Sequence, residues 1–129
     1  MTTPQNGANA QHPTSASATT GKNYVDSLLG GTQWGSGPGK GTTLTFSFPF
    51  ASSASAAWAS NPEYSTLNEP SSAFALDALQ QAAVRSALAT WSNVANITFT
   101  EVAESATNVG DLRVAWTNKT DSGAAAWAS

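Results

Sequence analysis

The sequence has no cysteine and a single histidine among its 129 residues. The lack of cysteine excludes disulfide bonds, thiol catalysis and cysteine-ligated metals. The one histidine, His12, lies in a segment rich in Thr, Ser, Ala, Asn and Gly, which is typical of a solvated tail. A three-histidine zinc site is therefore impossible within these residues, and a Ser-His-Asp triad would need its base from this segment.

Charge and long apolar runs are also scarce. Charged residues make up 10% of the chain, and its net charge is −3. The five basic residues are spread over the whole length without forming a stripe, so nucleic-acid binding is not expected. No apolar run approaches the roughly 18 residues that a membrane span needs. No amino-terminal segment combines a positive start with an apolar stretch, so an ordinary secretory signal is not expected.

Composition divides the chain into two parts. Residues 1–22 are poor in apolar side chains, and we expect them to form a disordered arm. Residues 23–129 are long enough for one domain with a modest core. Within them, Asn23 to Leu29 predicts a helix of about two turns that ends at Gly30 and Gly31.

The most informative stretch is residues 77–102, which predict a helix, a turn and a strand. Asp77 and Gln80 fit a capping box at the start of the helix. Residues 97–102 alternate with period two and are rich in β-branched and aromatic side chains, as in a strand. The apolar positions predicted to form one stripe along the helix are Leu79, Ala83, Val84, Ala87, Leu88 and Trp91.

Three further strands are predicted. Thr43 to Phe48 alternates, with Leu44, Phe46 and Phe48 facing one way; Asp111 to Trp116 forms a second strand, and Ala124 to Ala128 a short last one. The order strand, helix, strand predicts a βαβ unit whose two strands are parallel. The expected fold class is α+β (α/β-like), with a mixed twisted sheet of about four strands, one long helix packed on it and a short amino-terminal helix.

Weaker signals have simple structural interpretations. Asn96 and Asn118 open glycosylation patterns that we interpret as chance matches. Asp26 and Asp77 are interpreted as helix-end residues, and Glu101 as part of the exposed face of a strand. Trp91 and Trp116 lie at core spacing, whereas Trp127 is equally compatible with packing and with a surface role. Residues 51–72 predict a long loop.

Several blocks of the sequence resemble the serralysins, secreted bacterial zinc proteases of the metzincin group (peptidase family M10). The most specific is QQAAVRSALATWSNVANITFTEV, which resembles the family's first long helix and second strand. YVDSLLGGTQWG, TLTFSFPF, GDLRVAW and AAAWA resemble its first helix, first strand, third strand and the start of its cleft-lining edge strand. The resemblance covers roughly residues 24–127.

The resemblance implies a metal-dependent peptidase fold. The family's motif H-E-x-x-H-x-x-G-x-x-H, whose histidines bind zinc and whose Glu is the general base, is absent from these residues. Residues 23–129 are thus expected to be a partial catalytic domain, truncated before the zinc motif and lacking its carboxy-terminal half. The one assignment that carries over is the edge strand at Ala124, Ala125, Ala126 and Trp127, which would bind a protein or peptide substrate.

The functional hypothesis is a fragment of a secreted zinc-dependent metalloendopeptidase, inactive alone. The resemblance implies zinc and possibly calcium in the parent protein, and an extracellular location reached without an amino-terminal signal peptide. The alternative is a non-catalytic peptide- or carbohydrate-binding surface module, in which Trp58, Trp116 and Trp127 would contact the sugar.

Overall fold

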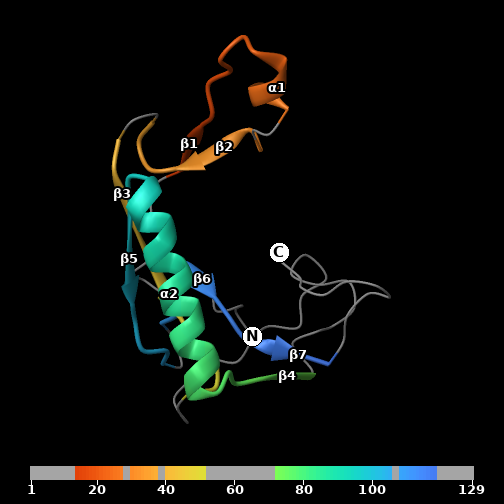
Figure 1. Cartoon of the computed structure of the whole chain (residues 1–129), viewed down its shortest axis with the longest axis vertical. Helices are drawn as coiled ribbons and strands as arrows, with labels where there is room; N and C mark the ends of the chain where they lie inside the picture. The colour runs from red at the N-terminus through yellow and green to blue at the C-terminus, as the bar shows by residue number, and fades with distance from the viewer. Residues whose placement is uncertain (1–13, 28–29, 38–39, 52–71, 106–107, 119–129) are drawn as a thin grey trace.

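The computed structural model describes residues 14–27, 30–37, 40–51, 72–105 and 108–118 (Figure 1). These residues form a mixed α and β structure with one long helix. The elements are β1 (Thr14–Ala16), α1 (Asn23–Asp26), β2 (Thr32–Trp34), β3 (Thr42–Ser47), β4 (Ala73–Phe74), α2 (Ala78–Val94), β5 (Ile97–Glu101), β6 (Leu112–Arg113) and β7 (Trp116–Thr117).

The central sheet has three strands in the order β5-β3-β6, and both outer strands run parallel to β3. Leu44 lies beside Phe99, and Phe46 lies between Glu101 and Leu112. The predicted βαβ unit is therefore confirmed: β3 and β5 are parallel neighbours, and α2 forms the connection between them. In Figure 1, α2 runs lengthwise along this sheet.

The predicted four-stranded mixed sheet needs correction. The region expected to be one strand, Asp111 to Trp116, forms two short ones. β6 joins the central sheet, whereas β7 pairs antiparallel with β4 in a separate two-stranded sheet. Between the two strands, the N–H of Val114 donates to the Ser47 carbonyl of β3 at 3.2 Å. The predicted last strand, Ala124 to Ala128, lies outside the described residues.

The core lies between the sheet and α2. The alternation of β3 places Leu44, Phe46 and Phe48 on the buried side, and the Phe46 and Phe48 rings meet edge to face with centroids 5.7 Å apart. Leu76 completes the buried cluster. Partly buried side chains of the helix and the neighbouring strands pack against it: Val84, Leu88, Phe99, Leu112, Val114 and Ala115.

The capping box at the start of α2 is confirmed. The Asp77 carboxylate accepts a hydrogen bond from the Gln80 N–H at 2.8 Å, and the Gln80 side chain accepts from the Asp77 N–H at 2.9 Å. Each bond satisfies a main-chain donor that the first helical turn would leave free. The local sequence therefore sets where the helix begins.

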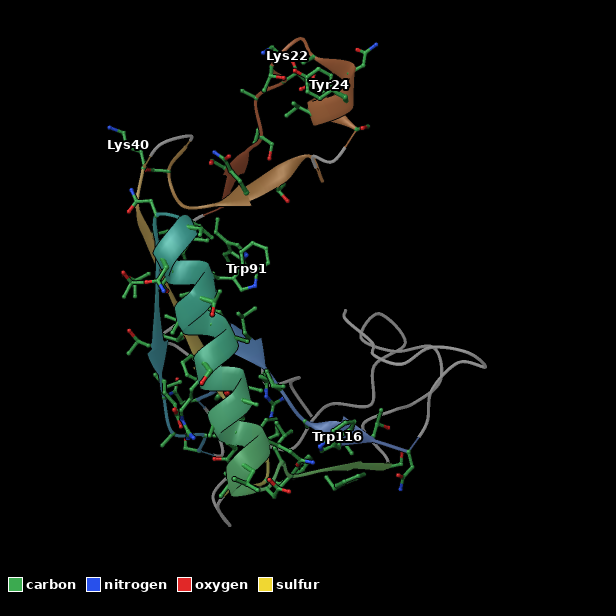
Figure 2. The ribbon with its side chains drawn as sticks, in the orientation of Figure 1. Lys22, Tyr24, Lys40, Trp91 and Trp116 are labelled. Carbon is green, nitrogen blue, oxygen red and sulfur yellow. The ribbon has the colours of Figure 1, made fainter. Side chains whose placement is uncertain are left out.

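The predicted apolar stripe of α2 is only partly correct. Val84 and Leu88 pack on the core, but Leu79 is 83% exposed and Trp91 is 63% exposed. Leu79 is five residues from Val84, which places it about 140° around the helix. Trp91 lies in the last turn, and Figure 2 shows its side chain extending sideways from that end of α2. Trp116, also expected in the core, is 44% exposed.

The amino-terminal region contains ordered elements. Thr14–Ala16, within the segment expected to be a disordered arm, pairs antiparallel with β2. The helix expected over Asn23 to Leu29 is shorter than predicted: it spans Asn23–Asp26, and Ser27 is its C-cap. The Asp26 carboxylate accepts hydrogen bonds from the N–H and the hydroxyl of Thr20 at 2.7 and 2.8 Å. These hydrogen bonds lower the pKa of Asp26, and the bond from the Thr20 N–H contributes most. Asp26 thus ties the helix end to the chain preceding it.

Gly110 is required where β6 approaches β3. A Cβ atom at this position would lie 2.6 Å from the Phe46 carbonyl carbon and 2.8 Å from the Ser47 nitrogen. Both are main-chain atoms of the central strand, so the clash could be relieved only by moving the sheet. Gly30, by contrast, has open space around its Cβ position.

We expect Gly110→Ala to lower the free energy of unfolding by roughly 1–3 kcal/mol, because an added methyl overpacks the β3–β6 contact. Urea denaturation followed by tryptophan fluorescence would measure the loss. Gly30→Ala is the matched control and should leave the midpoint almost unchanged. Equal midpoints for the two variants would contradict the close approach of Gly110 to β3.

Candidate functional site

A groove of about 560 Å³ lies between α2 and β5. Its apolar lining comes from Phe46, Leu88, Ala89, Ala95, Ile97 and Phe99. Ser92 and Asn93 from the last turns of α2, with Asn96 from the following turn, add hydroxyl and amide groups. Thr98 lines it as well. The volume falls in the range of small-molecule and peptide side-chain sites.

The remaining lining residues of the groove are an ion pair, Arg85 with Glu101. The guanidinium donates from Nε to one Glu101 oxygen at 2.6 Å and from Nη2 to the other at 2.8 Å. Arg85 also lies over the Phe48 ring, 5.1 Å from its centroid, in a cation–π contact. Glu101 is exposed, as expected, but it lies on the helix side of the sheet.

The ion pair shifts the pKa of both side chains. Hydrogen bonds from Arg85 hold the pKa of Glu101 below its ordinary value, and the same bonds raise the pKa of Arg85. The two side chains are 40% and 43% exposed, so solvent screens their attraction. Their bidentate geometry fixes the orientation of both groups at the groove more than it stabilises the fold.

A second ion pair is buried on the opposite face of β3. Arg113 donates from Nε and Nη2 to the two oxygens of Glu104, each at 2.8 Å, and these side chains are 4% and 1% exposed. The Ser47 hydroxyl donates to Glu104 at 2.7 Å and accepts from the Gly110 N–H at 2.9 Å. Breaking such a buried pair typically costs about 3–5 kcal/mol. This cluster, which we call the Glu104–Arg113 network, holds β6 to β3.

Asp111 extends the polar contacts on that face. Its carboxylate accepts from the N–H and the hydroxyl of Thr45, both at 2.7 Å, and its own N–H donates to the Thr45 hydroxyl at 3.0 Å. A side chain thus satisfies a main-chain donor of β3 where β6 has not yet begun. These contacts and the Glu104–Arg113 network are structural, because neither set lines the groove.

The described residues of the groove have the features of a binding surface. Arg85 and Glu101, its charged residues, already neutralise each other. Among the described residues, no hydrogen bond joins the Ser92 hydroxyl to a histidine or a carboxylate that could act as its base. Within the described ranges, His, Cys, Asp and Glu side chains do not gather in groups of three that could hold a metal.

The predicted substrate-binding residues lie outside the described residues: Ala124, Ala125, Ala126 and Trp127. The same holds for His12 and Trp58. Sequence reasoning did not find the groove. Arg85 and Glu101 are 16 positions apart, and only the βαβ crossover brings them together. Glu104 and Arg113 were missed for the same reason, since nothing in the residues next to either charge indicates that the two are buried together.

Comparison with known proteins gives no relative: no family model, curated protein or solved structure matches this chain.

Among the described helices, none is both long and apolar enough to cross a membrane.

Replacing Arg85 by Met should raise the pKa of Glu101 toward its ordinary value, because the hydrogen bonds that lower it are lost. A group with a depressed pKa stabilises the folded state above its unfolded pKa, and this contribution disappears as the pH falls through the folded value. The variant should therefore lose stability at neutral pH and match the wild type in acid. NMR titration of the Glu101 carboxyl measures the shift.

Arg85→Lys is the control for this experiment, since it keeps the positive charge and should retain part of the shift. An unchanged pKa of Glu101 in Arg85→Met would contradict the ion pair.

Proposed function

We propose that residues 23–129 are the amino-terminal part of the catalytic domain of a secreted serralysin-type zinc endopeptidase. The proposal is supported by one observation above all. The blocks that resemble the family's first strand, long helix and second strand form β3, α2 and β5, with β3 and β5 as parallel neighbours, and the third-strand block contributes Leu112–Arg113 to the same sheet as β6. A chance likeness of separate blocks would not require them to pack together.

In this proposal the chain supplies scaffold and substrate binding. The described residues do not fit a catalytic zinc, and the whole sequence offers the single histidine His12. The zinc ligands and the general base would come from outside these residues, where zinc would activate water for hydrolysis of internal peptide bonds. Ala124 to Trp127 would bind an extended protein or peptide substrate through main-chain hydrogen bonds. Calcium binding and an extracellular location belong to the same proposal.

A second candidate is a non-catalytic peptide- or carbohydrate-binding module. The observation that favours it is a pair of exposed aromatic residues, Phe74 on β4 and Trp116 on β7. They lie side by side in the antiparallel register and are each 44% exposed. The Trp116 side chain is labelled in Figure 2. Neighbouring exposed aromatics present the flat apolar faces that sugar rings and peptide side chains stack on.

The proposals differ in what should follow codon 129 and in what the proteins should cleave. The peptidase proposal predicts an in-frame continuation into H-E-x-x-H-x-x-G-x-x-H. The extended protein should then cleave casein in a zinc-dependent manner, and replacement of the motif's Glu by Ala should abolish cleavage. The 129-residue chain alone should neither take up stoichiometric zinc nor cleave casein.

A stop codon directly after codon 129 would contradict the peptidase proposal. Quenching of tryptophan fluorescence by oligosaccharides, lost in Trp116→Ala, would then support the binding module.

A further inference from the structure

In the described part of the chain, the outer edge of β5 presents main-chain groups that do not bond to another strand. Along a strand, the N–H and C=O of successive residues point to opposite edges. The Asn96 carbonyl accepts from Thr42 and the Val102 N–H donates to Phe46, so even-numbered residues of this segment face β3. Ile97, Phe99 and Glu101 therefore direct their main-chain groups outward. Among these, the N–H of Ile97 already donates to the Ala95 carbonyl at 2.8 Å.

This edge lacks the usual protection against strand pairing. In the part of the chain that the structure describes, no strand lies on the outer side of β5, which Figure 1 shows along one side of the sheet. Natural edge strands are commonly blocked by lysine, proline or a bulge. Residues 97–101 contain neither lysine nor proline, and their one charged residue, Glu101, is neutralised by Arg85.

The strand is self-complementary about Phe99. Thr98-Phe99-Thr100 reads the same in both directions. An antiparallel copy centred on Phe99 would place Phe99 beside the partner's Phe99 and Thr98 beside the partner's Thr100. Phe99 would exchange N–H and C=O bonds with the partner's Phe99, and the Glu101 N–H would donate to the partner's Ile97 carbonyl. This register uses the outward carbonyl of Ile97 without requiring its occupied N–H.

The side chains agree with the same register. Ile97, Phe99 and Glu101 share the helix face with Thr42, Leu44 and Phe46, and they line the groove. In a joined sheet the partner's Phe99 would lie on this face too and cover apolar lining that is now open. Thr98 and Thr100 are exposed on the other face, where threonines directly opposite each other pair favourably.

We propose that two copies of this chain associate through antiparallel pairing of β5 with the partner's β5, centred on Phe99, to form one continuous sheet. An extended peptide could use the same outward groups, but only a second copy matches the symmetry of Thr98-Phe99-Thr100. The proposal does not depend on the proposed peptidase function, because neither the zinc motif nor Ala124 to Trp127 takes part.

Charges placed on the exposed face test both the association and its register. In T98K/T100K, the lysine introduced at position 98 would face the partner's lysine at position 100, and like charges directly opposite are unfavourable. We expect association to weaken by roughly tenfold or more, because two such repulsions arise across the twofold axis. T98K/T100E is the matched control: it changes the same positions but faces each lysine with a glutamate, so it should still associate.

Sedimentation equilibrium distinguishes the 13.2 kDa monomer from a species of twice that mass. The wild type and T98K/T100E should shift toward the dimer as concentration rises, while T98K/T100K stays monomeric. Mixing T98K/T100K with T98E/T100E should restore association as a mixed dimer. Amide exchange at Phe99 and Glu101 should be slow in the wild-type dimer and fast in T98K/T100K. The amides at positions 98 and 100, which face β3, should exchange at the same rate in both proteins.

Three results would overturn the proposal. One is a wild type that stays monomeric at every concentration, even if that monomer binds extended peptides. Another is a T98K/T100K variant that dimerises as well as the wild type. The third is a T98K/T100E variant that behaves like T98K/T100K, which would indicate a different register or another surface.

Discussion

The β3 strand supplies the contacts on which the other described elements of the sheet depend. Both edges of β3 are hydrogen-bonded, to β5 on one side and to β6 on the other. Its two faces are chemically distinct. Phe46 and Phe48 pack with Val84 and Leu88 of α2, whereas Thr45 and Ser47 bind carboxylates on the opposite face. Because every second side chain changes face, a shift of one residue would bury threonine in the core and expose phenylalanine.

Among the described residues, the opposite face of β3 is held by specific polar contacts. The Glu104–Arg113 network supplies a bidentate ion pair, and the Ser47 hydroxyl links it to the Gly110 main chain. Such contacts stabilise the sheet only when every buried group is paired, and they tolerate little displacement. On the helix face, a groove lies where α2 and β5 do not fill the space between them.

Local patterns predicted much of this fold. The alternation of β3 and the capping box of Asp77 and Gln80 depend on nearby residues, and the parallel β3–β5 pairing follows from the handed, helix-containing connection. The exposure of Leu79 follows from its position about 140° around the helix from Val84. The sequence could not predict that Trp91 would be exposed, because an apolar stripe does not reveal how much of it a narrow sheet covers. Arg85 with Glu101 and Glu104 with Arg113 also escaped prediction, since each pair is assembled only by tertiary structure.

Amide hydrogen exchange measured residue by residue by NMR tests the central position of β3 most directly. If β5 pairs parallel to β3 in the observed register, the amides of Leu44, Phe46, Thr98 and Thr100 exchange slowly, because their main-chain groups join the two strands. The Thr45 amide should also be protected, through the Asp111 carboxylate, and should lose that protection in Asp111→Ala. Uniformly fast exchange along both strands would contradict the account.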